Sequence, residues 1–201
     1  MGEPDLAVAL TRLDEITRRL RRDCPWDREQ DERSIVPHTL EEAYELAAAA
    51  HAGDDPKLLD ELGDVLFQVH FLSLLLEERG AGTMADVAEH IRAKLVRRHP
   101  HVFGDRAAET AGDVVRNWNQ IKRDDERGGE IFGEIPETLP STLYAKKILK
   151  RASSAGRDFT AGEGPGERLL EAVRDSLVAG EDPELALRQA ADRFRDEVEA
   201  E

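Results

Sequence analysis

Apolar residues recur at intervals of three and four positions along most of this chain of 201 residues. Such spacing places them on one face of an α-helix, whereas a half-buried β-strand alternates every second residue. No Val- or Ile-rich alternating segment bounded by turns occurs, and aromatic residues make up only 5% of the chain. Because β-branched and aromatic residues favour strands, we predict an all-α fold of antiparallel helices joined by short connections.

Two segments show the helical period most clearly. Residues 5–22 carry leucines and an isoleucine at this spacing, and residues 54–80 carry a wider apolar stripe. The stripe predicts that residues 54–80 form the central buried helix. Its members are Leu58, Leu59, Leu62, Val65, Leu66, Val69, Leu72 and Leu76.

Prolines and glycines divide the rest of the chain. Pro25 interrupts the period and predicts a loop over residues 22–34, and a helix is then expected from about Thr39 until Gly53 stops it. The residues 153–167 are rich in Gly and Ser and are the best candidate for a linker. Further helices are expected at about 84–98, 111–127, 141–154, 167–179 and 183–200.

The chain has a formal net charge of −15, which argues against binding a nucleic-acid polymer because the phosphates would be repelled. A small polyphosphate could still bind if divalent cations mediate the contact. The only cysteine, Cys24, allows no internal disulfide, which fits a reducing cytoplasm. The N-terminal residues do not resemble a signal peptide, and the longest apolar run, Val69 to Leu76, is too short to span a membrane.

Five carboxylates fall in two short motifs. The first motif has the form E-E-x-x-E and the second E-x-x-D, so the members of each lie about one helical turn apart. A short turn at residues 53–56 joins the two expected helices, which makes them antiparallel neighbours whose acidic faces can meet. The five residues are Glu41, Glu42, Glu45, Glu61 and Asp64.

Converging carboxylates repel one another unless cations lie between them. Magnesium suits such a site because it prefers oxygen ligands and substrate phosphates, and manganese is an acceptable substitute. Acidic helix faces are also common without a metal, but Glu61 and Asp64 lie in the most apolar helix, where unpaired charge is costly. A di-iron bundle would require Glu-x-x-His motifs, which these segments lack.

Basic and aromatic residues supply a second group of candidates. Lys94, Arg97 and Arg98 share one helix face and could bind a triphosphate. Trp118 could stack on a base, with Lys122 one turn later near a phosphate. The alternatives are that the arginines only complement a helix C-terminus and that the tryptophan is a core residue.

Five strings in this order resemble the MazG family of nucleoside triphosphate pyrophosphohydrolases: CPWDREQ (24–30), LEEAYEL (40–46), DELGDVLFQVHF (60–71), KLVRRHPHVFGD (94–105) and NWNQIK (117–122). The resemblance implies a MazG-like helical bundle whose four-helix core is completed by dimerisation. It also implies an enzyme that hydrolyses NTP or dNTP to NMP or dNMP and diphosphate.

The resemblance assigns roles to the candidates. It implies Mg²⁺ ligands at Glu42, Glu45, Glu61 and Asp64, with Glu41 or Glu45 as the catalytic carboxylate that orients water. It places Lys94, Arg97 and Arg98 at the triphosphate, and Trp118 and Lys122 near the nucleotide.

Longer members of the family carry two such domains in tandem. We therefore expect a catalytic domain at residues 1–125, a connecting loop and helix at 126–155, and a linker with the helical remnant of a degenerate second domain at 156–201.

Two alternative functions stay open. One is a related pyrophosphohydrolase with a narrow substrate, such as dCTP, dUTP or phosphoribosyl-ATP, and the other is a non-catalytic helical regulator that only binds nucleotides. The preferred base and sugar, the number of metal ions and the choice between dimer and tetramer also stay open.

Overall fold

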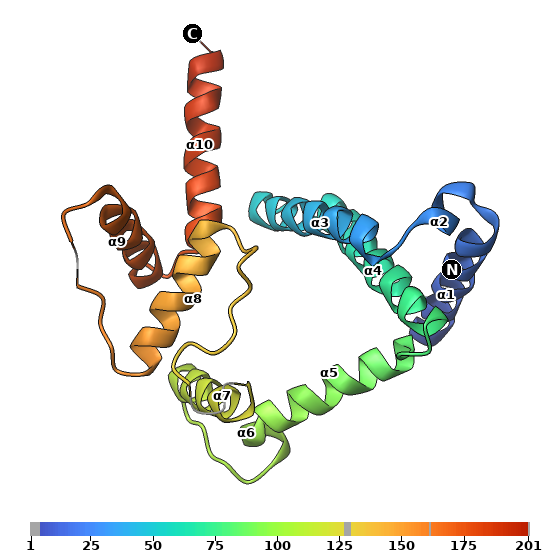
Figure 1. The fold of residues 1–201 in the computed structure, drawn as a ribbon, viewed down its shortest axis with the longest axis horizontal. Helices are drawn as coiled ribbons and strands as arrows, with labels where there is room; N and C mark the ends of the chain where they lie inside the picture. Colours follow the sequence, from blue (N-terminus) through green and yellow to red (C-terminus); the bar gives the residue numbers. More distant parts are fainter. Residues whose placement is uncertain (1–4, 127–129, 161, 201) are drawn as a thin grey trace. The chain divides into compact units, whose positions relative to one another are not determined.

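The structure is a computed structural model that describes residues 5–126, 130–160 and 162–200 (Figure 1). Within these ranges it contains ten α-helices and no strand, which confirms the all-α prediction. The chain forms two compact units, unit 1 (Met1–Leu95) and unit 2 (Val96–Glu201). The predicted domain boundaries at 125/126 and 155/156 stay predictions.

Unit 1 is built on an antiparallel helical hairpin of α3 (Glu32–Ala52) and α4 (Asp55–Glu78). Gly53 ends α3 in the left-handed conformation, with φ of 68°, which a residue with a side chain rarely adopts. The Asp54 side chain then caps α4 by accepting a hydrogen bond from the backbone N–H of Lys57. The short turn therefore fixes how α3 and α4 face each other.

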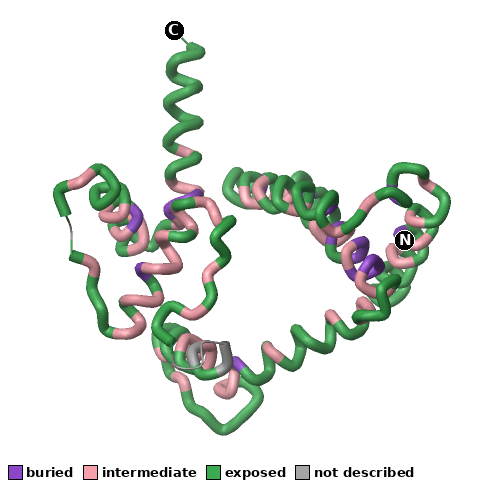
Figure 2. Tube along the Cα trace, viewed as in Figure 1, coloured by how far each residue is buried: buried purple, intermediate pink, exposed green. Residues whose placement is uncertain are grey.

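The core of unit 1 lies between α3 and the second half of α4. Ile35, Phe71 and Leu75 are each 4% exposed or less, and Phe67 and Leu72 pack against them. Helix α1 (Leu6–Asp23) packs on α4, and the short α2 (Pro25–Glu29) follows it. In Figure 2, the buried residues of this unit accordingly gather where α1, α3 and α4 meet.

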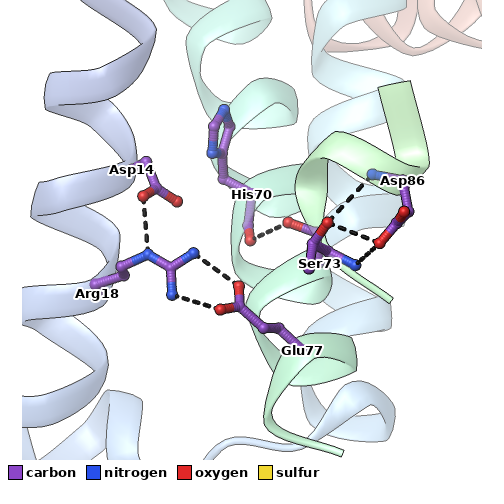
Figure 3. A network of polar contacts seen from close by, with 7 residues as sticks. Asp14, Arg18, His70, Ser73, Glu77 and Asp86 are labelled. Carbon is purple, nitrogen blue, oxygen red and sulfur yellow. Dashed lines mark hydrogen bonds and ion pairs between the residues drawn. The ribbon is translucent and has the colours of Figure 1, made fainter. Parts of the chain in front are cut away.

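Two arginines of α1 form hydrogen bonds with glutamates at the C-terminal end of α4. Arg18 donates one hydrogen bond to Asp14 and two to Glu77, with N···O distances of 2.7–3.1 Å (Figure 3). Arg21 likewise donates two bonds to Glu78, both 2.8 Å long, and two more to the backbone carbonyls of Asp27 and Gln30. These paired contacts fix α2 and its loop against the α1–α4 contact.

The expected start of α3 near Thr39 is wrong. The helix begins at Glu32, because Asp31 and Ser34 form a reciprocal capping box. Pro37 lies inside the helix at the cost of one backbone hydrogen bond, and this cost is offset by the capping box and by the burial of Ile35. The segment expected as a loop also contains α2, with Pro25 in its first turn.

Helix α4 is the most buried helix of unit 1, as predicted, but only part of the predicted stripe is covered. Leu59, Leu62 and Val69 of the predicted stripe are 74%, 50% and 36% exposed. The buried positions of α4 instead include several polar residues. They are Glu61, Gln68, His70, Phe71, Ser73, Leu74 and Leu75.

Helix α5 (Met84–Arg98) contains the boundary between the two units, and α6 (Pro100–Phe103) and α7 (Ala111–Glu126) follow it in unit 2. Its second half is formed by α8 (Ser141–Ser154), α9 (Pro165–Val178) and α10 (Pro183–Glu199). Five predicted helices are confirmed as α5, α7, α8, α9 and α10. Each observed end lies within two residues of the predicted one. Arg127, the expected last residue of the α7 helix, lies outside the described residues.

Helices α8, α9 and α10 pack together around a small core. Leu149, Val173 and Pro183 are buried there, and the side chain of Glu184 is buried beside them. Beyond the first turns of α10 the side chains are largely exposed (Figure 2). In the described part of the chain, no helix has the length and apolar character needed to cross a membrane.

Candidate functional site

The α3–α4 hairpin brings three of the five predicted carboxylates together. Glu42 and Glu45 lie one turn apart on α3, and Glu61 faces them from the second turn of α4. One carboxylate oxygen from each lies within 4.8 Å of the other two. It is the one group of this kind that the described residues contain, and it confirms that the two acidic helix faces meet.

Glu61 is the member of the cluster that is most withdrawn from solvent. It is only 5% exposed, and its Oε2 atom has no hydrogen-bond partner within the described residues. Lys57, one turn earlier on α4, places its Nζ atom 3.9 Å from the other oxygen of Glu61. A buried carboxylate oxygen without a partner is costly, so this position favours a ligand that supplies positive charge.

Burial and mutual repulsion shift the titration of the cluster. The pKa of Glu61 is raised, first by desolvation and then by the negative charge of Glu45, while Lys57 acts in the opposite direction. The pKa of Glu42 is also raised, first by desolvation and then by the charges of Asp64, Glu45 and Glu61. Both shifts mean that the fully ionised cluster is held under electrostatic strain unless a cation joins it.

The other two predicted carboxylates lie at the edge of the cluster. Asp64 is exposed on α4, one turn after Glu61, and it is close enough to raise the pKa of Glu42. Glu41 is also exposed, and its Oε2 atom lies 3.9 Å from Nδ1 of His38. Neither residue belongs to the group of three whose oxygens converge.

Arg98 and Trp118 form a second candidate group, in unit 2. Arg98 is only 3% exposed, and its guanidinium carbon lies 5.3 Å from the centre of the Trp118 ring. The His99 ring contacts Trp118 edge-on, with ring centres 4.8 Å apart. Trp118 therefore has a cation near its ring and an imidazole at its edge, and the structure brings these two predicted residues together.

The remaining basic candidates are more accessible. Lys94 is half-buried and Arg97 is exposed, both on α5. Lys122 is half-buried on α7, one turn after Trp118. Lys94 belongs to unit 1, whereas Arg97 and Lys122 belong to unit 2.

Three residues near these groups were not predicted from the sequence. Lys57 lies four positions before Glu61, a helical spacing that could have indicated the contact. Gln68 lies seven positions after Glu61 on the same helix face, is 7% exposed, and has an Oε1 atom without a partner among the described residues. His38 contacts the ring of Trp26 at 6.0 Å, and no helical spacing indicates that contact, because the two residues lie on different helices.

The fold and the cluster together define a class, the all-α proteins in which a helical hairpin gathers glutamates into one candidate cation site. The comparisons with known proteins identify the family. Residues 30–103, which include all five carboxylates, match the MazG nucleotide pyrophosphohydrolase domain. The chain belongs to the MazG family.

Two named relatives are similar over most of this chain. It is 41% identical to the nucleoside triphosphate pyrophosphohydrolase of Escherichia coli K12 over 75% of its own length and 60% of that protein. It is 37% identical to the nucleoside triphosphate pyrophosphohydrolase/pyrophosphatase MazG of Thermotoga maritima over 86% of its length and 65% of that protein. The chain thus spans less than two thirds of either pyrophosphohydrolase.

A third relative is similar over nearly the whole chain. It is a 26.1 kDa protein encoded in the blaB 3′ region of Streptomyces cacaoi, 41% identical over 99% of this chain and 85% of that protein. Among solved structures, a mazG-related protein from Thermotoga maritima covers 56% of this chain and 98% of its own, with 22% identity and a TM-score of 0.49.

Proposed function

We propose that this chain is a nucleoside triphosphate pyrophosphohydrolase that converts NTP or dNTP and water to NMP or dNMP and diphosphate. The observation that carries the proposal is the convergence of Glu42, Glu45 and Glu61 at one end of the α3–α4 hairpin. The pyrophosphohydrolases from Escherichia coli and Thermotoga maritima support it, because this chain is 41% and 37% identical to them over 75% and 86% of its length, and the MazG domain match at residues 30–103 contains the cluster.

The chemistry of the cluster fits Mg²⁺, with Mn²⁺ as a substitute. All its donors are carboxylate oxygens, which hard divalent cations prefer, and the unpartnered Oε2 of Glu61 would gain a partner. We propose Glu42, Glu45, Glu61 and Asp64 as the residues that hold the ion. When bound, the ion supplies positive charge that stabilises the negative charge on the phosphoryl oxygens.

The other candidates then take roles around the triphosphate. Glu41 or Glu45 would orient the attacking water, since both are exposed carboxylates on the cluster side of α3. Lys94, Arg97 and Arg98 would bind the triphosphate and offset charge on the departing diphosphate. Trp118 and Lys122 would contact the nucleotide. These roles, and a cytoplasmic setting, are proposals.

A hydrolysis screen tests the function directly. The full chain is incubated with canonical and damaged NTPs and dNTPs, with Mg²⁺ or with EDTA, and released diphosphate is measured. The proposal expects release that requires the metal. Release from a single nucleotide, or from phosphoribosyl-ATP alone, would favour a narrow-substrate enzyme. No metal-dependent release from any substrate, together with nucleotide binding, would favour a non-catalytic regulator.

Matched variants test the site. Glu42→Gln and Glu61→Gln remove one ionisable oxygen each and should abolish hydrolysis while leaving the helical content unchanged. Glu15→Gln is the control, because Glu15 is an exposed carboxylate on α1 that does not belong to the cluster. Retained activity in either glutamine variant would remove the site assignment.

We further propose that two chains associate through the exposed apolar face of the hairpin. Leu40 on α3 and Leu59 and Leu62 on α4 are 58%, 74% and 50% exposed, although each continues an apolar helix stripe. Burial of such side chains is worth roughly 1.5–3 kcal/mol each. Light scattering should therefore find dimers for the natural chain and monomers for Leu59→Glu/Leu62→Glu. A monomeric natural chain that hydrolyses NTP would contradict this arrangement.

A further inference from the structure

Unit 2 contains a basic segment, although the chain as a whole is acidic. Residues 141–157 contain five lysines and arginines and no acidic residue, in a protein whose formal net charge is −15. These residues form α8 and the turn that follows it. The five are Lys146, Lys147, Lys150, Arg151 and Arg157.

Part of this basic segment lines a cavity. The cavity has a volume of about 560 Å³ and lies between α7, α8, α9 and the turn after α8. Four cationic side chains line it, with a single acidic one, Asp158. The four are Lys150, Arg151, Arg157 and Arg174.

Two of the arginines are held in place by other groups. Arg151 donates hydrogen bonds to the backbone carbonyls of Phe132 and Glu134. Arg174 is held by Glu171 and Asp175 and lies 6.0 Å from the centre of the Phe159 ring. Because these contacts already restrict the two guanidinium groups, less conformational entropy is lost when a ligand binds them.

The other two cations are uncompensated. Lys150 and Arg157 are exposed and make no ion pair within the described residues. Asn119 and Ser153 add neutral hydrogen-bonding groups to the same cavity wall. The cavity therefore has more positive charge than its own acidic neighbours neutralise, together with donors suited to phosphate oxygens.

We propose that this cavity is a second ligand site, which binds the polyphosphate group of a small molecule without a divalent cation. Its volume is in the range of small-molecule sites. A long polyanion would meet the acidic surface of the rest of the chain, so the ligand is a small anion, either an inorganic polyphosphate or a nucleoside polyphosphate. None of the five carboxylates of the α3–α4 hairpin lines this cavity.

Titration calorimetry of the full chain in EDTA tests the proposal, because EDTA removes any cation-dependent binding at the carboxylate cluster. The probes are inorganic triphosphate, pyrophosphate, orthophosphate and a non-hydrolysable ATP analogue. Triphosphate should bind more tightly than orthophosphate, since it can contact more of the four cations. Tighter binding of the ATP analogue than of triphosphate would identify a nucleoside polyphosphate as the ligand, and equal binding would identify the inorganic anion.

The variant Lys150→Ala/Arg157→Ala should weaken triphosphate binding by about tenfold or more, because it removes two charged donors. The control Lys147→Ala/Arg193→Ala removes the same charge from side chains of unit 2 that do not line the cavity, and it should bind as the natural chain does. Glu61→Gln should also bind normally. Equal weakening in the control, unchanged binding in Lys150→Ala/Arg157→Ala, or no binding of any probe at millimolar concentration would overturn the proposal.

Discussion

Among the described residues, each unit buries one glutamate, but the surroundings of the two differ. Glu61 in unit 1 is 5% exposed, and its Oε2 atom has no hydrogen-bond partner in the described structure. Glu184 in unit 2 is 9% exposed and accepts hydrogen bonds from the Thr142 hydroxyl and from the Arg188 guanidinium. One carboxylate is thus satisfied by the protein and the other is not.

The neighbouring acids show the same contrast. Burial alone would raise the pKa of Asp182, but hydrogen bonds from Lys146 and from the backbone N–H groups of Leu185 and Glu184 lower it below its ordinary value. The pKa of Glu42 is raised by desolvation and by other carboxylates. In unit 2, Glu184 and Asp182 are paired with cations and other hydrogen-bond donors, whereas Glu42 and Glu61 of unit 1 are grouped with other carboxylates. That difference separates a structural carboxylate from one that awaits a ligand.

The largest expected effect comes from Glu61→Gln. Hydrolysis should fall by about 100-fold or more, since charge stabilisation by a metal contributes several kcal/mol to the barrier. The melting temperature in EDTA should stay the same or rise, because the substitution removes a strained negative charge. Steady-state diphosphate release and circular dichroism measure the two effects. A large loss of stability with normal turnover would make Glu61 structural and would end the contrast between the units.

The opposite outcome is expected for Glu184→Gln. The change weakens the bonds from Thr142 and Arg188 and should lower the free energy of unfolding by about 1–3 kcal/mol. Hydrolysis by the folded protein should change by no more than about twofold. Urea titration and the same activity assay report the two quantities. An inactive but fully stable Glu184→Gln would place this residue in the catalytic machinery instead.

The pH dependence of stability gives a smaller effect with a definite sign. Because the folded pKa values of Glu42 and Glu61 are raised, the folded state binds more protons than the unfolded state in the range just above the ordinary glutamate pKa. Stability in EDTA should therefore fall as the pH rises through that range, relative to Glu42→Gln/Glu61→Gln. Near neutral pH, saturating Mg²⁺ should make the natural chain more stable than Glu42→Gln/Glu61→Gln, because the ion binds only the ionised cluster. If the free energies of unfolding of the two proteins in EDTA change in parallel with pH, the carboxylates of the cluster do not destabilise one another.

The smallest effect on activity is expected from deleting residues 156–201. This segment contributes no residue to the glutamate cluster, so metal-dependent hydrolysis should stay within a few-fold of the full chain. The assay is run beside light scattering, which checks the oligomeric state. Loss of hydrolysis in a folded truncation with the natural oligomeric state would show that residues 156–201 are not a remnant without activity.

Local patterns predicted most of the helices. Leu6, Leu10 and Leu13 at helical spacing, and Gly53 as a helix stop, indicate elements whose signals lie within a few residues. The predicted start of α3 near Thr39 is wrong because the loop predicted around Pro25 was extended to residue 34, and this range includes the capping box of Asp31 and Ser34. A proline inside a helix is tolerated only when tertiary packing compensates, and that packing is not visible in a local pattern.

The meeting of Glu42, Glu45 and Glu61 could be predicted because a short turn makes two helices antiparallel neighbours. The buried face of α4 could not, since an apolar stripe that runs around much of a helix does not specify which side packs on α3 and α1. Gln68 and His70 are buried although neither belongs to the predicted stripe, and Leu59 and Leu62 of the stripe are exposed. The pairing of Glu184 with Thr142 likewise joins residues 42 positions apart, a contact that no helical period contains.

The central claim is that Glu42, Glu45 and Glu61 together bind a divalent cation. Crystals of the full chain grown with Mn²⁺ would test it through the anomalous signal of the metal. We predict an anomalous peak bounded by carboxylate oxygens of all three residues, and no such peak in isomorphous Glu61→Gln crystals. Three carboxylates turned toward bulk solvent, with no peak between them at saturating Mn²⁺, would contradict the account.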